Sequence, residues 1–161
     1  MTSSTANHPT VIQMRLVVEA EDYEEAVQFY RDVLGLPELE AFEGEGDARV
    51  AILDAGRATL EIANPAQKRM IDDVEVGRQV APKLRVAFEV ADSARATDKL
   101  VSSGAELIAA PRETPWRSLN SRLTAPAGLQ ITLFQELESL EARSVNAGFG
   151  TDASHAATRD P

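Results

Sequence analysis

Few side chains in this 161-residue chain are suited to catalysis. Cysteine is absent, which excludes a thiolate nucleophile, a disulfide and a cysteine metal ligand. The two histidines, His8 and His155, fall in terminal stretches whose small, polar composition predicts disorder. The predicted folded part therefore has no histidine to activate a serine for acyl transfer. Nor does a glycine-rich phosphate loop stand between a strand and a helix. The remaining candidates are carboxylates and arginines.

The charge balance narrows the class of partner. Asp and Glu number 26 against 16 Lys and Arg, which gives a formal net charge of −10. Such a chain is a poor nucleic-acid binder, because phosphates need a basic face. The acidic surface favours solubility and, more weakly, a cationic partner. No apolar run approaches the roughly 20 residues that span a bilayer, and no secretory signal is present, so we predict no membrane partner and a cytoplasmic location.

The chain is organised around the stretch RLVVEAEDYEEAVQFY at 15–30. A similar stretch, RVAFEVADSARATDKL, begins at Arg85 and aligns with it without a gap. In both, an apolar strand leads to an acidic helix cap, Asp22 or Asp92, and then to an amphipathic helix. The repeat predicts two copies of one structural unit.

Turn signals between apolar runs predict the same order, β-α-β-β-β, in both copies. The first module is expected over 11–63, with strands at 11–18, 39–42, 49–53 and 58–62 and a helix from Asp22 to Gly35. The second is expected over 83–136, with strands at 84–90, 106–110, 118–124 and 129–135 and a helix from Asp92 to Ser103. Residues 64–82 are predicted to form a connector with a short helix, or a lid over a pocket. Residues 1–10 are expected to be a disordered tail, and 137–161 a C-terminal extension and flexible tail.

The order of these segments resembles the vicinal oxygen chelate superfamily, the group of glyoxalases, bleomycin-resistance proteins and extradiol dioxygenases. The resemblance rests on FYRDVLGL in the first module and on AFEVAD, PRETPW and APAGLQITLFQ in the second, and it spans roughly residues 12–135. It implies an α+β fold in which two tandem βαβββ modules form a curled mixed sheet, with a central cleft and helices on the outer face. It also implies a homodimer.

Metal-dependent proteins of this type take one ligand from the first and last strand of each module. The resemblance places those positions at Arg15, Glu61, Arg85 and Thr132. Strand alternation predicts that all four point away from the helices and into the cleft. Only Glu61 is of a metal-binding type, because arginine stays protonated and has no lone pair to donate. We therefore predict no metal and no cofactor.

Three roles are open to the cluster of Arg15, Glu61 and Arg85. Glu61 could simply neutralise the arginines. One arginine could instead bind a carboxylate, phosphate or enolate oxygen. The role of Glu61 as a catalytic general base is least favoured, because a nearby cation lowers a carboxylate's pKa.

Other residues are expected to line the cleft. Trp116 is either a stacking wall for a flat ligand or a packing residue. Gln13, Glu89, Gln130 and Phe134 share the cleft-facing register, although simple filling of the sheet face also explains them. Arg117 and Arg122 are interpreted as solvated charges.

Three functions fit these observations. The first is binding of a small organic molecule in the cleft without metal, similar to the bleomycin-resistance-type sequestering proteins. The second is a metal-independent lyase, isomerase or cyclase that uses the Arg-Glu-Arg cluster to stabilise an oxyanion. The third is a structural or regulatory domain whose cleft is closed by side chains.

Overall fold

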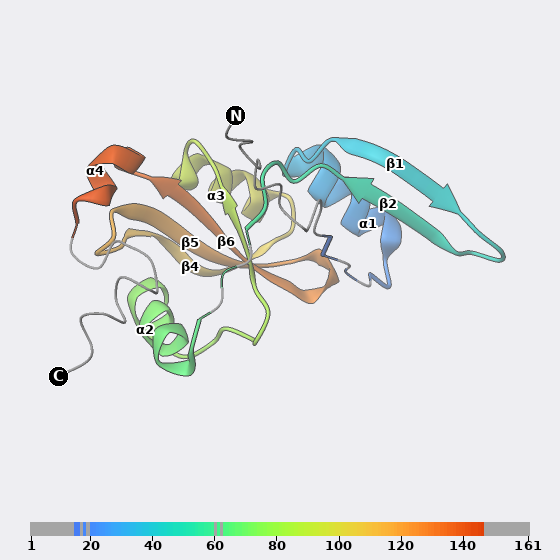
Figure 1. Ribbon diagram of the computed structural model, residues 1–161. Coiled ribbons are helices and arrows are strands. Elements are labelled where there is room, and N and C mark those ends of the chain that lie inside the picture. The colour runs from blue at the N-terminus through green and yellow to red at the C-terminus, as the bar shows by residue number, and fades with distance from the viewer. Residues whose placement is uncertain (1–14, 17, 19, 60, 62, 147–161) are drawn as a thin grey trace, which may run out of the picture.

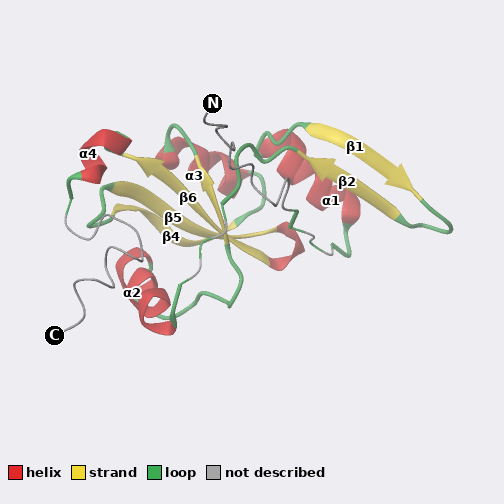
Figure 2. Ribbon diagram, in the orientation of Figure 1, coloured by secondary structure: helices red, strands yellow, loops and turns green. Residues whose placement is uncertain are grey.

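The protein was analysed as a computed structural model, which describes residues 15–146 except 17, 19, 60 and 62. The described part is a mixed α+β structure with a two-stranded and a four-stranded sheet (Figures 1 and 2). The α+β class is confirmed. No helix among the described residues is long and apolar enough to cross a membrane.

The second module forms the four-stranded sheet. Its order is β3-β6-β5-β4, with β3 parallel to β6 and the other neighbours antiparallel. The chain runs through β3 (Val86–Glu89), α3 (Ser93–Ser102), β4 (Glu106–Glu113), β5 (Ser118–Ala125) and β6 (Leu129–Glu136). This is the predicted β-α-β-β-β order, although β4 extends through Pro111, which had been expected in a turn.

The first module is less complete in the described residues. Helix α1 (Tyr23–Val27) continues into a π-helical segment, η1 (Gln28–Val33), and strands β1 (Glu38–Glu43) and β2 (Arg49–Leu53) form an antiparallel hairpin. This hairpin projects away from the four-stranded sheet (Figure 1). The described residues of 11–18 and 58–62 are not in strands, contrary to the prediction. A strand needs a hydrogen-bonded neighbour, and in the described ladders β1 and β2 pair only with each other.

The repeated helix caps are present in both modules. Asp22 Oδ1 accepts the Glu25 N–H and Asp92 Oδ1 accepts the Arg95 N–H, each at 3.0 Å. These bonds satisfy N–H groups that the first helical turn leaves unpaired. The predicted caps are therefore confirmed. The first helix ends before Gly35, whose φ of 88° suits the left-handed turn expected there.

One hydrophobic core joins the two modules. Phe29 from η1 packs in the same buried cluster as Leu100 of α3 and the sheet residues Leu123, Ile131 and Leu133. These apolar residues lie on one side of the four-stranded sheet, which we call the outer face.

The opposite side, the inner face, carries a different helix. Helix α2 (Pro65–Glu75) comes from the connector and contacts β5, and it lies across the sheet from α3 (Figure 2). The short helix predicted in this segment is thus present. A last short helix, α4 (Leu140–Ser144), follows β6.

Candidate functional site: the inner face of the second sheet

The strand register collects polar side chains on the inner face. Asn120 and Arg122 of β5 pair with Phe134 and Thr132 of β6, and Thr132 pairs in turn with Ala87 of β3. Paired residues share a face and side chains alternate along a strand. The inner face therefore carries polar and charged residues where the outer face carries leucine and isoleucine.

Arg85 immediately precedes β3, at one end of this face. Its guanidinium is partly buried and donates a hydrogen bond from Nη1 to Thr132 Oγ1. Within the described part of the chain, the other Arg85 donors have no hydrogen-bond partner. Burial lowers the pKa of Arg85, helped by the nearby Arg122 cation and opposed by the carboxylates of Glu75, Glu61 and Asp72.

Arg122 is fully buried, with 0% of its surface exposed, and so is Asp72. Its Nη1 is 2.9 Å from Asp72 Oδ1, and its Nη2 donates to Glu75 Oε2. Both carboxylates come from α2, at positions three residues apart on one face of that helix. The interpretation of Arg122 as a solvated charge is wrong, because α2 removes this part of β5 from water.

Polar partners complete this buried network. Gln130 Oε1 accepts a second bond from Arg122 Nη1 at 2.9 Å, and Asn120 Nδ2 donates to Glu75 Oε1 at 2.7 Å. Asp72 Oδ2 accepts the backbone N–H groups of Val80 and Ala81, each at 2.8 Å. These bonds fix α2 and the chain after it against the inner face, so the β5 half of that face is closed by side chains.

The buried network changes the pKa of the Asp72 carboxyl group. Burial by itself raises its pKa, but the N–H groups of Ala81 and Val80 and the Arg122 guanidinium outweigh burial. The pKa of Asp72 is lowered as a result, and the group stays ionised in the folded protein.

The half of the inner face along β3 is open, although Thr132 of β6 beside it is buried. Ala87 and Glu89 are exposed and Phe134 is partly buried. At the end of the face away from Arg85, Glu136 forms an ion pair with Arg143 of α4, with 3.1 Å between Oε1 and Nη1. Glu136 Oε2 is buried and has no hydrogen-bond partner among the described residues. Burial raises the pKa of Glu136, and the nearby Glu89 carboxylate adds to this effect while Arg143 opposes it.

The residues predicted to line the cleft fall into three groups. Arg85, Thr132, Gln130 and Phe134 lie together on the inner face. Arg15 and Glu61 are exposed, and no hydrogen bond or ion pair joins Glu61 to Arg85 in the described structure. Gln13 lies outside the described residues. The ligand-binding role of each stays a prediction.

Trp116 lies in the turn between β4 and β5 and is 36% exposed. Ser118, at the end of β5 that follows Trp116, pairs with Glu136 of β6. Glu136 is six positions along β6 from Gln130. At about 3.3 Å per residue, Trp116 is therefore roughly 20 Å along the sheet from the Gln130 end. The structure does not bring Trp116 next to Arg85.

Sequence reasoning missed Asp72, Glu75, Asn120 and Arg122 as members of one site. The sequence did indicate that Asn120 and Arg122 share one face of a strand, because they alternate with their neighbours in SLNSRLTA. Gln130, Thr132 and Phe134 alternate in the same way in LQITLFQ. Nothing in the sequence indicated that α2 would cover them.

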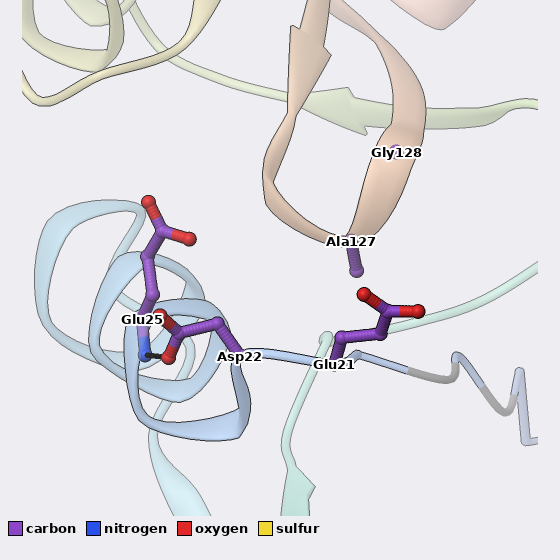
Figure 3. Close-up of a pocket in the computed structure, with 5 residues that line it drawn as sticks. All are labelled: Glu21, Asp22, Glu25, Ala127 and Gly128. Atoms are coloured by element: carbon purple, nitrogen blue, oxygen red, sulfur yellow. Dashed lines mark hydrogen bonds between the residues drawn. The ribbon is translucent and has the colours of Figure 1, made fainter.

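Surface hollows lie elsewhere, beside α1. One of about 390 Å³ is lined by Glu21, Asp22, Glu25, Ala127 and Gly128. Figure 3 shows the carboxylates around the gap between the helix start and the turn before β6, with Asp22 engaged as the helix cap. A larger one, of about 920 Å³, adjoins Tyr23 and Arg49. Both are open and mainly acidic, and neither includes a residue of the inner face.

A metal ion does not fit the positions that the fold would use for one. Arginine at 15 and 85 offers no lone pair, and Thr132 Oγ1 already accepts the Arg85 bond. Across the described residues, no three His, Cys, Asp or Glu side chains gather in a way that could hold a metal.

Comparison with known proteins identifies the family. The model of the Glyoxalase/Bleomycin resistance protein/Dioxygenase superfamily matches residues 12–133. The chain belongs to this superfamily. The resemblance seen in the sequence is therefore confirmed. A search of curated proteins gives no match.

Solved structures of the superfamily share the fold at low identity. TnmS3, an antibiotic-binding protein from Streptomyces sp. CB03234, is 20% identical with a TM-score of 0.52, over 80% of this chain and 99% of TnmS3. A superfamily member from Sphaerobacter thermophilus DSM 20745 is 21% identical with a TM-score of 0.50, over 74% of this chain and 92% of that protein. At these identities the likeness concerns the fold alone.

Proposed function

We propose that this superfamily member binds a small organic molecule on the open half of the inner face, without a metal ion and without chemical turnover. The observation that carries the proposal is the Arg85 guanidinium. Thr132 holds it by one bond, and its remaining donors are unpaired among the described residues. A guanidinium placed in this way suits a carboxylate, phosphate or enolate oxygen, because its planar fork can donate two parallel bonds.

Partial burial strengthens this case. Desolvation lowers the pKa of Arg85, although arginine remains protonated at neutral pH. A cation that has lost part of its hydration gains more from an anionic partner than one on the open surface. Ala87, which is exposed two positions along from Arg85, and Phe134, which is partly buried farther along the same face, offer apolar surface for the body of a ligand. TnmS3 is an antibiotic-binding protein with this fold, and we propose an activity of the same general class here.

A thermal-shift screen against organic acids tests the proposal. A ligand that binds only the folded state raises the apparent stability. We expect aromatic carboxylates to raise the Tm of the wild type and to have a smaller effect on Arg85→Met. Arg95→Met is the matched control, because Arg95 lies on α3 at the outer face. An equal loss of response in both variants would contradict a site at Arg85.

An enzyme is the second candidate. It is supported by the Glu61 carboxylate, which lies near enough to Arg85 to raise the pKa of that guanidinium against the effect of burial. Together they would stabilise and position an enolate-type intermediate in a lyase, isomerase or cyclase reaction. Loss of turnover with retained binding in Glu61→Ala would favour this candidate, and binding without any product in the wild type would favour sequestration.

Three further parts of the proposal need their own measurements. Elemental analysis of the purified protein should show no stoichiometric zinc, nickel, manganese or iron. Light scattering should give the mass of a homodimer. A cytoplasmic location should appear in cell fractionation.

A further inference from the structure

The open half of the inner face carries opposite charges at its two ends. We define the strip as Arg85, Ala87, Glu89, Phe134 and Glu136. Arg85 lies at one end, and Glu89 and Glu136 lie at the other. Ala87 lies between Arg85 and Glu89 on the same strand, and Phe134 lies beside Glu89 on the neighbouring strand β6. Arg85 and Glu89 are four positions apart along the chain, which corresponds to about 13 Å in an extended strand.

The acidic end is a cluster with an unsatisfied acceptor. Glu136 directs Oε1 to Arg143, and the other oxygen, Oε2, is buried without a hydrogen-bond partner among the described residues. Glu89 is exposed and close enough to raise the pKa of Glu136. Two carboxylates and one guanidinium leave a net negative charge at this end. Because Oε2 of Glu136 is buried, the exposed Glu89 carboxylate is the acceptor that this end offers to a ligand amine, and Glu136 adds negative charge beside it.

At the basic end, the carboxylates of Asp72 and Glu75 are already bound to other protein groups. Asp72 and Glu75 bind Arg122, Asn120 and backbone N–H groups under α2. Arg85 is thus the charge that this end presents to the open face. Glu61 is close by but forms no ion pair with it in the described structure.

We propose that the strip recognises an elongated amphoteric molecule, with a carboxylate or similar anion at Arg85, a flat apolar body over Ala87 and Phe134, and an amine at Glu89 and Glu136. This inference rests on the proposed function and narrows its ligand class.

A series of biphenyl probes tests the charge pattern in the wild-type protein. The series comprises 4′-(aminomethyl)biphenyl-4-carboxylic acid, biphenyl-4-carboxylic acid, biphenyl-4-ylmethanamine and biphenyl-4-ylmethanol. Calorimetry at low salt gives each Kd, and NMR shift mapping locates the site. We expect the amphoteric probe to bind about fivefold more tightly than either singly charged probe, since a solvent-exposed ion pair contributes modestly.

Variants assign each charge to an end of the strip. Arg85→Gln should weaken the two carboxylate probes and spare the amine, whereas Glu89→Gln should weaken the two amine probes and spare the acid. Arg95→Gln and Asp98→Asn on α3 are the matched controls at the outer face. Equal affinity of the acid and amphoteric probes on the inner face would overturn the inference and leave the proposed function standing. Absence of inner-face shifts with every probe, together with no response in the organic-acid screen, would overturn both.

Discussion

Arg122→Met is the sharpest test of how α2 is held. The substitution removes a fully buried cation and leaves Asp72 and Glu75 under α2 without a counter-charge. Breaking a buried ion pair from one side costs about 3–5 kcal/mol, because the remaining charge stays desolvated. Two carboxylates share this cation, so we expect a loss near the upper part of that range. This is a large fraction of a typical unfolding free energy of about 5–15 kcal/mol.

Urea unfolding followed by circular dichroism measures this loss. A drop of about 4–5 kcal/mol corresponds to a Tm decrease of roughly 10–15 °C in a chain of this size. Arg112→Met is the matched control, because Arg112 also touches α2, through the Val74 carbonyl at 3.3 Å, but is exposed. We expect Arg112→Met to lower the unfolding free energy by less than about 0.5 kcal/mol.

A triple variant separates the ion network from simple packing. It combines Arg122→Met, Asp72→Asn and Glu75→Gln. These changes remove both ion pairs and leave no unpaired charge. The large cost of a single substitution comes from the charge left buried without a partner, and the triple variant leaves no such charge. The triple variant should therefore be more stable than Arg122→Met alone. If Arg122→Met costs less than about 1 kcal/mol, α2 does not exclude water from β5 and the reasoning is refuted.

The same network predicts a dependence on pH. The pKa of Asp72 is lower in the folded protein than in the unfolded chain, so its contribution to stability is complete above the unfolded pKa. That contribution is lost as the pH falls through the folded pKa. The stability difference between the wild type and Arg122→Met should therefore narrow in acid, and a difference that widens below pH 4 would contradict the assigned direction.

Three further substitutions test the outer-face core and the helix cap. Phe29→Ala should lower the unfolding free energy by about 3–5 kcal/mol in urea titration, because Phe29 is buried in the shared core. Asp92→Ala should cost about 1 kcal/mol by losing the cap bond to the Arg95 N–H, and Asp92→Asn should retain most of it. Burial raises the pKa of Tyr30 to about 12, so its share of stability is complete below pH 10 and is lost as the pH rises toward 12. Tyr30→Phe should lose less unfolding free energy than the wild type between pH 10 and pH 12. An identical loss in both proteins would contradict the raised pKa of Tyr30.

The second module could be predicted well because its signals are local. Alternation in LQITLFQ and SLNSRLTA specifies which side chains share a face, and Asp92 and Gly104 mark the ends of one helix. These features depend on neighbouring residues, so one sequence is sufficient to read them.

The buried network could not be predicted because it depends on long-range contact. Arg122 and Asp72 are 50 positions apart, and an arginine in a strand is exposed in most proteins. Only the docking of α2 makes it buried, and no periodicity encodes where a connector helix will lie. The described residues of the strands expected at 11–18 and 58–62 show the same limit, since an apolar run becomes a strand only beside a partner.

The position of Phe29 has a consequence for whether the two halves can be separated. This side chain leaves its own repeat and fills the core of the other, beside Leu100 and Ile131. A fragment ending at residue 63 would expose Phe29, and a fragment beginning at residue 83 would contain a void where its ring belongs. The two halves are thus similar in sequence but share one core, so neither half is expected to be stable without the other.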